Sequence, residues 1–240
     1  MRSLELAKRN LKEVWRDPLS LGITVGLPVV LLLVLQAFGQ FDAIFAPTSL
    51  APGIVLFGFV MLMFSAAMTL SRDRESALFA RLLTAPVRAS DFVAAYSLPY
   101  LPVAIFQGVL LFGIGAFLGL KVEGSIGLVF LVLLVMSMFY IGLGMALGSL
   151  LSVAPLSGAY AVVLILTIFG GAWMDLDAIG GAFQSVGQAL PFAHALDATR
   201  NIMIGGAGFS SIATDFYWVL GYTLAVVALA LVLFRRKMLE

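Results

Sequence analysis

The sequence predicts an all-α integral membrane protein with six transmembrane helices. Six uncharged apolar stretches of roughly 19 to 27 residues run along the chain, and a helix needs about 20 apolar residues to cross the hydrocarbon of a bilayer. Twelve of the fourteen Lys and Arg residues lie before the first stretch, between the second and third, or after the last. Because basic residues concentrate in cytoplasmic loops, we expect a cell-membrane protein with both termini in the cytoplasm.

The composition excludes several classes of protein. With 62% hydrophobic and 11% charged residues, the chain has too little charge to cover a water-facing globule of 240 residues. The absence of Cys from these residues excludes disulfides, thiolate metal sites and cysteine nucleophiles. The expected cytoplasmic segments hold twelve Lys and Arg against seven Asp and Glu, and the external segments hold two against six. This asymmetry suits an integral membrane protein and gives no support to nucleic-acid binding.

Residues 1–17 are expected to form an amphipathic helix that lies along the cytoplasmic headgroups. One side of this helix would be apolar, and the charged residues would lie on the opposite side. The apolar residues, which follow helical spacing, are Leu4, Ala7, Leu11, Val14 and Trp15. A basic amphipathic helix that carries a Trp is typical of an interfacial segment, although a solvated charged leader is an alternative. Pro18 ends this segment, which lacks the pattern of a cleavable signal peptide.

The six spans are predicted at residues 19–38, 50–70, 92–118, 126–151, 156–174 and 216–234. Pro99 and Pro102 predict a kink near the cytoplasmic end of the third span. Close helix packing is expected at the small residues Gly142, Gly144, Ala146 and Gly148. Neither a repeat nor a low-complexity linker divides the sequence, so residues 1–240 are predicted to form a single domain.

Residues 71–91 form the most specific cytoplasmic segment. We expect a short helix here, with Asp73 and Glu75 in its first turn, Arg81 near its end and Pro86 as its stop. Its apolar side consists of Leu78, Phe79, Leu82 and Leu83. Such a helix offers both charge and apolar side chains to a soluble partner. The alternative is a solvated loop that merely follows the charge rule for cytoplasmic segments.

Two motifs carry a resemblance to a known family. Residues 74–87 read Arg-Glu-Ser-Ala-Leu-Phe-Ala-Arg-Leu-Leu-Thr-Ala-Pro-Val. They resemble the segment after the second span of ABC type-2 transporter permeases, roughly Arg-Glu-x-Gly-Thr-Leu-Glu-Arg-Leu-Leu-x-x-Pro-Val. Residues 190–200 are similar to the run Pro-(Leu/Phe)-x-x-Ala-(Ile/Leu)-(Asp/Glu)-Ala-x-Arg before the last span. Ala77, Leu78 and Ala80 depart from the usual Gly, Thr and second Glu.

The resemblance implies a homodimer or pseudo-dimer of six-span subunits, each seated on a separate ATP-binding subunit that holds ATP and Mg. It implies that the helix at residues 73–83 transmits nucleotide-driven closure to the spans. The residues expected to contact the ATPase subunit are Asp73, Arg74, Glu75, Leu78, Phe79, Arg81, Leu82, Leu83 and Pro86. A P-loop needs a Gly-Lys pair, and none of the four lysines follows a glycine, so we expect no enzyme activity or cofactor in this chain.

Residues 175–215 form the longest external segment. Glycines divide it into two short helical pieces, expected at residues 178–189 and 192–204, which dip back toward the bilayer. In the resembled family such half-helices form an external gate, which here would include Pro191, His194, Asp197 and Arg200. A gate latch or proton-sensitive contact is one interpretation of these side chains. The other is a polar cluster that pins the re-entrant piece.

A path for cargo is predicted from the apolar spans. Phe57, Met61 and Phe64 share one face of the second span at helical spacing, and we expect them to line the path with Thr167 and Phe169. The alternative is that these side chains only pack or face lipid. No predicted span has an interior Asp, Glu, Lys or Arg, whereas ion-driven carriers and channels commonly use buried ionisable groups.

The sequence therefore favours the membrane subunit of an ATP-driven exporter for a hydrophobic or amphiphilic compound, such as a drug, a lipid-linked molecule or a peptide. The main alternative is a self-contained carrier or channel without an ATPase partner, followed by a non-transporting scaffold. An intramembrane serine protease is disfavoured, because Ser157 lies at the inner end of the fifth span and His194 lies beyond its outer end. The cargo and the direction of transport stay open.

Overall fold

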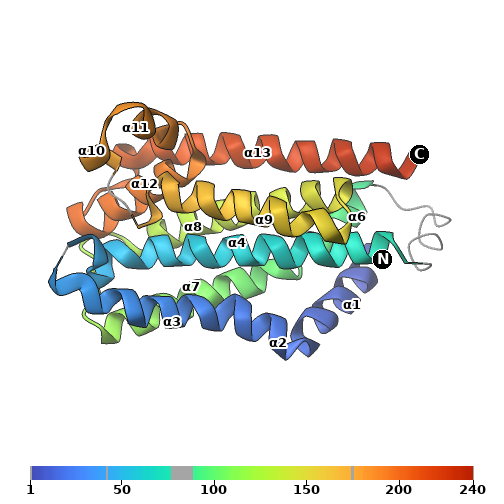
Figure 1. Cartoon of the computed structure of the whole chain (residues 1–240), viewed down its shortest axis with the longest axis horizontal. Helices are drawn as coiled ribbons and strands as arrows, with labels where there is room; N and C mark the ends of the chain where they lie inside the picture. The colour runs from blue at the N-terminus through green and yellow to red at the C-terminus, as the bar shows by residue number, and fades with distance from the viewer. Residues whose placement is uncertain (1, 42, 77–88, 174–175, 240) are drawn as a thin grey trace.

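The computed structural model of this chain describes residues 2–41, 43–76, 89–173 and 176–239. These residues form a helical bundle without strands. Long helices run side by side, with α10–α12 at one end of the bundle and both chain termini at the other (Figure 1). The helices are α1 (Arg2–Arg16), α2 (Pro18–Leu21), α3 (Leu27–Leu35), α4 (Pro47–Arg74), α6 (Ala89–Ser97), α7 (Tyr100–Phe117), α8 (Ile126–Leu150), α9 (Val153–Thr167), α10 (Leu176–Ile179), α11 (Gly181–Gln188), α12 (Pro191–Gly205) and α13 (Phe209–Leu239).

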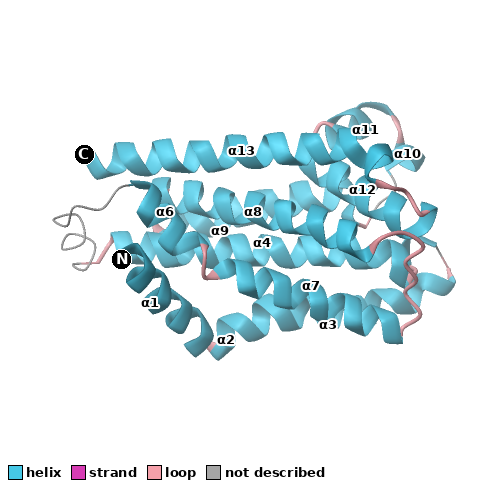
Figure 2. Ribbon diagram, turned by 180° about the vertical axis from the view of Figure 1, so that it is seen from behind, coloured by secondary structure: helices cyan, strands magenta, loops and turns pink. Residues whose placement is uncertain are grey.

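Within the described ranges, six helical stretches are long and apolar enough to cross a membrane, which confirms the predicted six spans. They are Pro18–Gly39, Pro47–Arg74, Ser90–Phe117, Ile126–Leu150, Val153–Ala172 and Phe209–Arg236. The turns alternate between the two ends of the bundle, so the termini lie at the same end (Figures 1 and 2). We call the end with the termini the inner end and the opposite end the outer end.

The first span is assembled from short pieces. Asp17 caps α2, because its carboxylate accepts a hydrogen bond from the backbone N–H of Ser20 at 3.1 Å. The hydrogen bonds from Ser20 lower the pKa of Asp17 below its usual value. A π-helical turn at Gly22–Gly26 then separates α2 from α3. This span begins at Pro18, which agrees with its predicted start at residue 19.

The third span is broken near its inner end, as Pro99 and Pro102 predict. Helix α6 ends at Ser97, and α7 begins at Tyr100 directly after Pro99. Proline has no backbone N–H to continue the helical hydrogen bonds, and its ring crowds the preceding turn. The break separates a short inner helix from the long membrane-crossing helix.

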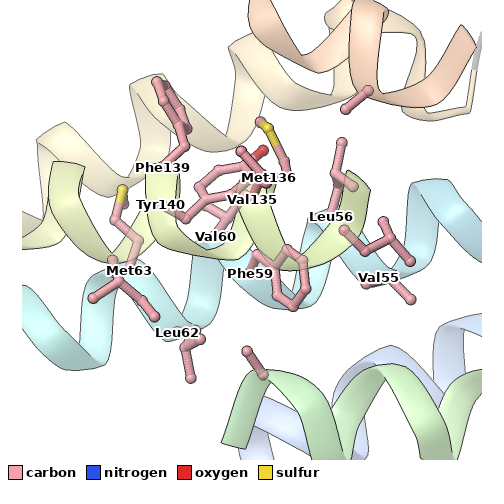
Figure 3. Packing of buried hydrophobic residues seen from close by; sticks show 14 of the residues in the cluster. Val55, Leu56, Phe59, Val60, Leu62, Met63, Val135, Met136, Phe139 and Tyr140 are labelled. Atoms are coloured by element: carbon pink, nitrogen blue, oxygen red, sulfur yellow. The ribbon is translucent and has the colours of Figure 1, made fainter. Parts of the chain in front are cut away.

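Helices α4 and α8 pack closely and form the centre of the bundle. A Cβ on Gly144 would lie 2.5 Å from the carbonyl oxygen of Met63, and one on Gly148 would lie 2.6 Å from that of Ala67. The predicted role of these glycines in close helix packing is confirmed. In the same contact, Phe59 of α4 packs near Tyr140 of α8, with ring centroids 6.2 Å apart (Figure 3).

Replacing Gly148 with Ala is expected to destabilise the bundle. The new Cβ would meet the backbone of α4, which cannot move aside without separating two packed helices, and such overpacking typically costs about 1–3 kcal/mol. Gly158 of α9 is a matched control, because a Cβ there would have no atom within 4 Å. Thermal unfolding of the purified chain should show a lower midpoint for Gly148→Ala than for Gly158→Ala. Equal midpoints would contradict this account of the packing.

The outer end differs from the sequence prediction in three places. The sixth span begins at Phe209 rather than at residue 216, so the external segment is shorter than predicted. Polar residues such as Ser210 and Asp215 lower the local hydropathy, but they do not interrupt helical backbone hydrogen bonds. The first external piece is two helices, α10 and α11, because Gly180 and Gly181 adopt positive φ angles of 68° and 67°.

The fifth span also ends differently. Helix α9 passes into a π-helical turn at Ile168–Ala172, where Gly170 and Gly171 leave helical geometry and Gly171 has φ of 96°. The span therefore ends at Ala172 rather than at residue 174. The second external piece agrees with its prediction, because Pro191 starts α12 and Gly206 closes it in the left-handed conformation.

Candidate functional site

Asp73 is the centre of a polar network at the inner end. Its Oδ2 accepts a hydrogen bond from Arg9 Nη2 at 2.7 Å and a second from the Tyr96 hydroxyl at 2.6 Å. Asn10 of α1 also donates to the carbonyl of Ala95 at 3.2 Å. Burial alone lowers the pKa of Arg9, but the charge and hydrogen bond of Asp73 outweigh it and raise that pKa overall. The network joins α1, α4 and α6.

A second set of contacts joins the inner ends of α4 and α8. Arg74 Nη1 donates to the carbonyl of Gly148 at 2.7 Å, and the Ser71 hydroxyl donates to the carbonyl of Leu151 at 2.9 Å. The last carbonyls of a helix have no partner within that helix, so both donors satisfy groups at the end of α8. A cation at this position also complements the helix dipole.

The predicted coupling residues divide into two groups. The prediction that Asp73 and Glu75 start a separate helix is wrong: Asp73 and Arg74 form the last turn of α4, and Glu75 is its exposed cap residue. The helix continues past its apolar stretch because both charged side chains have partners there. The other predicted coupling residues lie outside the described residues: Leu78, Phe79, Arg81, Leu82, Leu83 and Pro86.

Arg200 joins three elements at the outer end. Its guanidinium donates to the carbonyls of Gly171 at 3.0 Å, Ala172 at 3.2 Å and Ser49 at 3.2 Å. The first two carbonyls end the fifth span, and the third lies in the first turn of α4. The backbones are in close contact here, because a Cβ on Gly53 would overlap the Ala172 carbonyl. Arg200 therefore links α12 to the outer ends of α4 and the fifth span.

His194 makes its contacts with α13. Its Nδ1 lies 2.8 Å from Asp215 Oδ1, and its ring stacks on Trp218 with centroids 5.4 Å apart. His194 and Arg200 thus reach different neighbours, although the sequence places them on one helical face. The Asp197 side chain is exposed, and Pro191 is buried at the start of α12. A role for these four residues in a gate stays a prediction.

The five residues predicted to line the cargo path do not share one space. Met61 and Phe64 line a cavity of about 340 Å³, whereas Phe57, Thr167 and Phe169 do not. Phe57 packs on Trp173 with ring centroids 5.4 Å apart. Thr167 is fully buried and accepts a hydrogen bond from the Tyr140 hydroxyl at 2.8 Å while donating to the carbonyl of Val163.

The cavity lies at the inner end, between the start of the first span and helices α4, α7 and α9. Sequence reasoning missed its polar residues, including Asp17, Arg72 and Tyr100. Part of the signal was present: Ser65, Thr69 and Arg72 follow an i, i+4, i+7 spacing that places them on one face of α4. The contribution of α1 and α7 depends on tertiary packing and leaves no comparable pattern.

Within the described ranges, no group of three or more His, Asp or Glu side chains could hold a metal ion. The two polar assemblies described above, around Asp73 and Arg200, are instead tied to helix ends. Helix α4 connects the two assemblies. Its first turn contains Ser49, which accepts a hydrogen bond from Arg200, and its last turn contains Asp73.

Comparison with known proteins identifies the family. The family described as ABC-2 type transporter matches residues 3–204. The chain belongs to the ABC-2 type transporter family. The matched region includes both sequence motifs on which the expected resemblance was based, residues 74–87 and 190–200. The six candidate spans agree with this assignment. The family resemblance expected from those motifs is confirmed.

Curated ABC transporter proteins are similar to much of this ABC-2 type chain. It is 27% identical over 198 residues to ABC transporter G family member 20 of Dictyostelium discoideum, and this alignment covers 78% of this chain and 27% of that protein. It is 22% identical over 176 residues to "Probable multidrug ABC transporter permease YbhR" of Escherichia coli K12, and this alignment covers 72% of this chain and 48% of that protein. The aligned region is thus about a quarter of the first relative and about half of the second.

Proposed function

We propose that this chain is the permease subunit of an ATP-driven exporter for hydrophobic or amphiphilic compounds. The observation that carries the proposal is the ABC-2 type match over residues 3–204 of a six-span chain. A separate ATP-binding subunit, which the ABC-2 type family implies, is its partner in this proposal and supplies ATP and Mg. Residues 1–240 act as one membrane domain, with both termini in the cytoplasm.

A second copy of the chain completes the transporter in this proposal. Span surfaces are available for it and for lipid, because the most apolar windows of the first, fifth and sixth spans are only 17%, 22% and 17% buried. The second span, at 78%, is enclosed by its own subunit. The homodimer therefore forms through the peripheral spans, with α4 inside each copy.

The inner polar network supports residues 71–91 as the coupling segment. This segment connects the end of α4 to the start of α6 in the sequence. At the end of α4, the hydrogen bonds Arg9–Asp73 and Arg74–Gly148 tie this segment to α1 and α8. On the α6 side, the hydrogen bond from Asn10 to the carbonyl of Ala95 ties α6 to α1. A push on the segment would therefore move α1, α4, α6 and the end of α8 together.

Helix α4 then carries the movement to the outer end. ATP binding draws two partner subunits together, and they push on residues 71–91 of each chain. Because α4 packs along α8 and contacts Arg200 through Ser49, its tilt displaces α12 and the end of the fifth span. In this mechanism α12, with Pro191, His194, Asp197 and Arg200, is the moving part of the external gate.

The test is coupling between ATP hydrolysis and transport in inverted membrane vesicles. The chain should co-purify with an ATPase subunit and move the dye Nile red or rhodamine 123 only while ATP is hydrolysed. Substituting Glu75→Ala and Arg81→Ala together should leave ATPase activity measurable but lower transport at least tenfold, because the contact that transmits closure is removed. The control substitution is Glu123→Ala, which removes an exposed carboxylate from the α7–α8 turn at the outer end.

Two results would contradict the proposal. Dye movement that continues with a catalytically inactive ATPase would identify a self-contained carrier. Unchanged coupling in the Glu75→Ala/Arg81→Ala variant would remove residues 71–91 from the mechanism.

A further inference from the structure

We infer that the cavity of about 340 Å³ at the inner end binds an organic cation with an apolar body. The inference rests on the proposed function, because it narrows the substrate class of the same exporter. The cavity has an acidic mouth, a wall in which three hydroxyl hydrogens are already engaged, and an aromatic interior. Each of these three features favours a cation over an anion.

Among the residues that the structure describes, the mouth carries more negative than positive charge. The described lining includes the carboxylates of Glu13, Asp17 and Asp73 and one guanidinium, that of Arg72. Arg9 pairs with Asp73 at 2.7 Å and approaches Glu13 at 3.3 Å, which leaves three carboxylates against two guanidiniums. The hydrogen bonds from Ser20 lower the pKa of Asp17, which favours its ionised form. An approaching ammonium or phosphonium group is attracted, and an anion is repelled.

Three hydroxyl groups of the wall donate their hydrogen atoms within the protein. The Tyr100 hydroxyl donates to the carbonyl of Ser65 at 3.1 Å, so Thr69, 2.8 Å away, donates to Tyr100. The hydroxyls of Thr24 and Ser65 lie 3.4 Å apart, and one of them donates to the other. Because a hydroxyl group has a single hydrogen, the three hydroxyls that donate within the protein offer an oxygen atom rather than a donor to a ligand.

The interior is apolar and aromatic. The rings of Phe64 and Tyr160 lie with centroids 4.9 Å apart and form one side of the cavity with Met61 and Met68. Aromatic faces attract cations through their quadrupole, and Met side chains adapt to ligands of different shape. A ligand with its charge at the mouth and its apolar body against these side chains uses both halves of the cavity.

Two probes of the same shape and opposite charge test the inference. Binding of tetraphenylphosphonium and tetraphenylborate is measured on the full chain in lipid nanodiscs, with empty nanodiscs subtracted to remove partitioning into lipid. The chain should bind the phosphonium in preference to the borate. The Glu13→Gln/Asp17→Asn variant should bind tetraphenylphosphonium about tenfold more weakly, because two carboxylates are lost. Asn at position 17 retains the cap of α2, so the fold is kept.

Control variants separate the charge of the cavity from a general effect. Glu123→Gln removes an exposed carboxylate at the outer end and should leave binding unchanged. Tyr160→Leu should weaken binding of the phosphonium, whereas Tyr160→Phe, which keeps the ring, should not. Equal affinity for the two probes, or an unchanged affinity in the Glu13→Gln/Asp17→Asn variant, would overturn the inference. The assay contains no ATPase subunit, so these results are independent of the coupling experiment.

Discussion

Replacing Asp73 with Ala is expected to abolish coupled transport and to destabilise the chain by about 2 kcal/mol. The substitution leaves Arg9 without its closest carboxylate and the Tyr96 hydroxyl without an acceptor, at a site where the Asp73 side chain is 14% exposed. The magnitude is below that of a fully buried pair because Arg9 is 36% exposed. The measurements are thermal unfolding of the purified chain and ATP-dependent dye uptake in inverted vesicles.

A double-mutant cycle identifies the interaction responsible. Arg9→Met should lower stability as well, and adding it to Asp73→Ala should cost less than the sum of the single effects. Tyr96→Phe is the milder variant, because it removes one hydrogen bond and keeps the buried ring. Full additivity of Arg9→Met and Asp73→Ala would show that the contact between α1 and α4 has no energetic role.

Replacing Arg200 with Met is expected to produce the largest effect at the outer end. The backbone carbonyls of three residues lose their guanidinium donor: Ser49, Gly171 and Ala172. We expect the free energy of unfolding to fall by about 2–4 kcal/mol. The junction between α12, α4 and the fifth span would then open, and transport should fall together with stability. Thermal unfolding and vesicle transport measure the two effects.

Variants with a retained or distant charge serve as controls. Arg200→Lys should have a stability and a transport rate between those of the unmodified chain and Arg200→Met. Lysine keeps the positive charge, but its ammonium group lacks the planar fork with which the guanidinium reaches several carbonyls at once. Lys121→Met removes an exposed basic residue from the α7–α8 turn at the outer end and should have little effect. If Arg200→Met unfolded at the same temperature as Lys121→Met, the proposed role of this junction would be wrong.

The spans could be predicted from the sequence because lipid imposes a local rule. A helix that satisfies its own backbone and presents apolar side chains is readable from a continuous run of residues. The same applies to the break at Pro99 and to the contact made by Gly144 and Gly148, since both depend on properties of single residues. The family motifs at residues 74–87 and 190–200 were also readable directly.

The polar contacts could not be predicted because their partners lie far apart in the chain. Asp73 looked like the start of a new helix, since its partner Arg9 lies 64 positions away and Tyr96 lies 23 positions away. Arg200 and Ser49 are 151 positions apart. The spacing of His194 and Arg200 suggested one polar cluster, but each side chain contacts a different element.

The cavity shows a further limit of periodicity. Phe57, Met61 and Phe64 share a face of α4, yet Phe57 is packed by Trp173 while the other two line the cavity. Which part of an apolar face stays open depends on the neighbouring helices, and here the first span diverges from α4 at the inner end. Hydropathy alone carries no information on that divergence.

The most direct measurement of the central claim is the membrane side of the segment that connects α4 to α6. The chain contains no Cys, so Glu75→Cys and Glu123→Cys each introduce one thiol at an exposed position. In intact cells, a membrane-impermeant maleimide should label the Glu123→Cys variant and leave the Glu75→Cys variant unlabelled until the membrane is opened. Labelling of Glu75→Cys from outside would place the coupling segment away from ATP and contradict the mechanism.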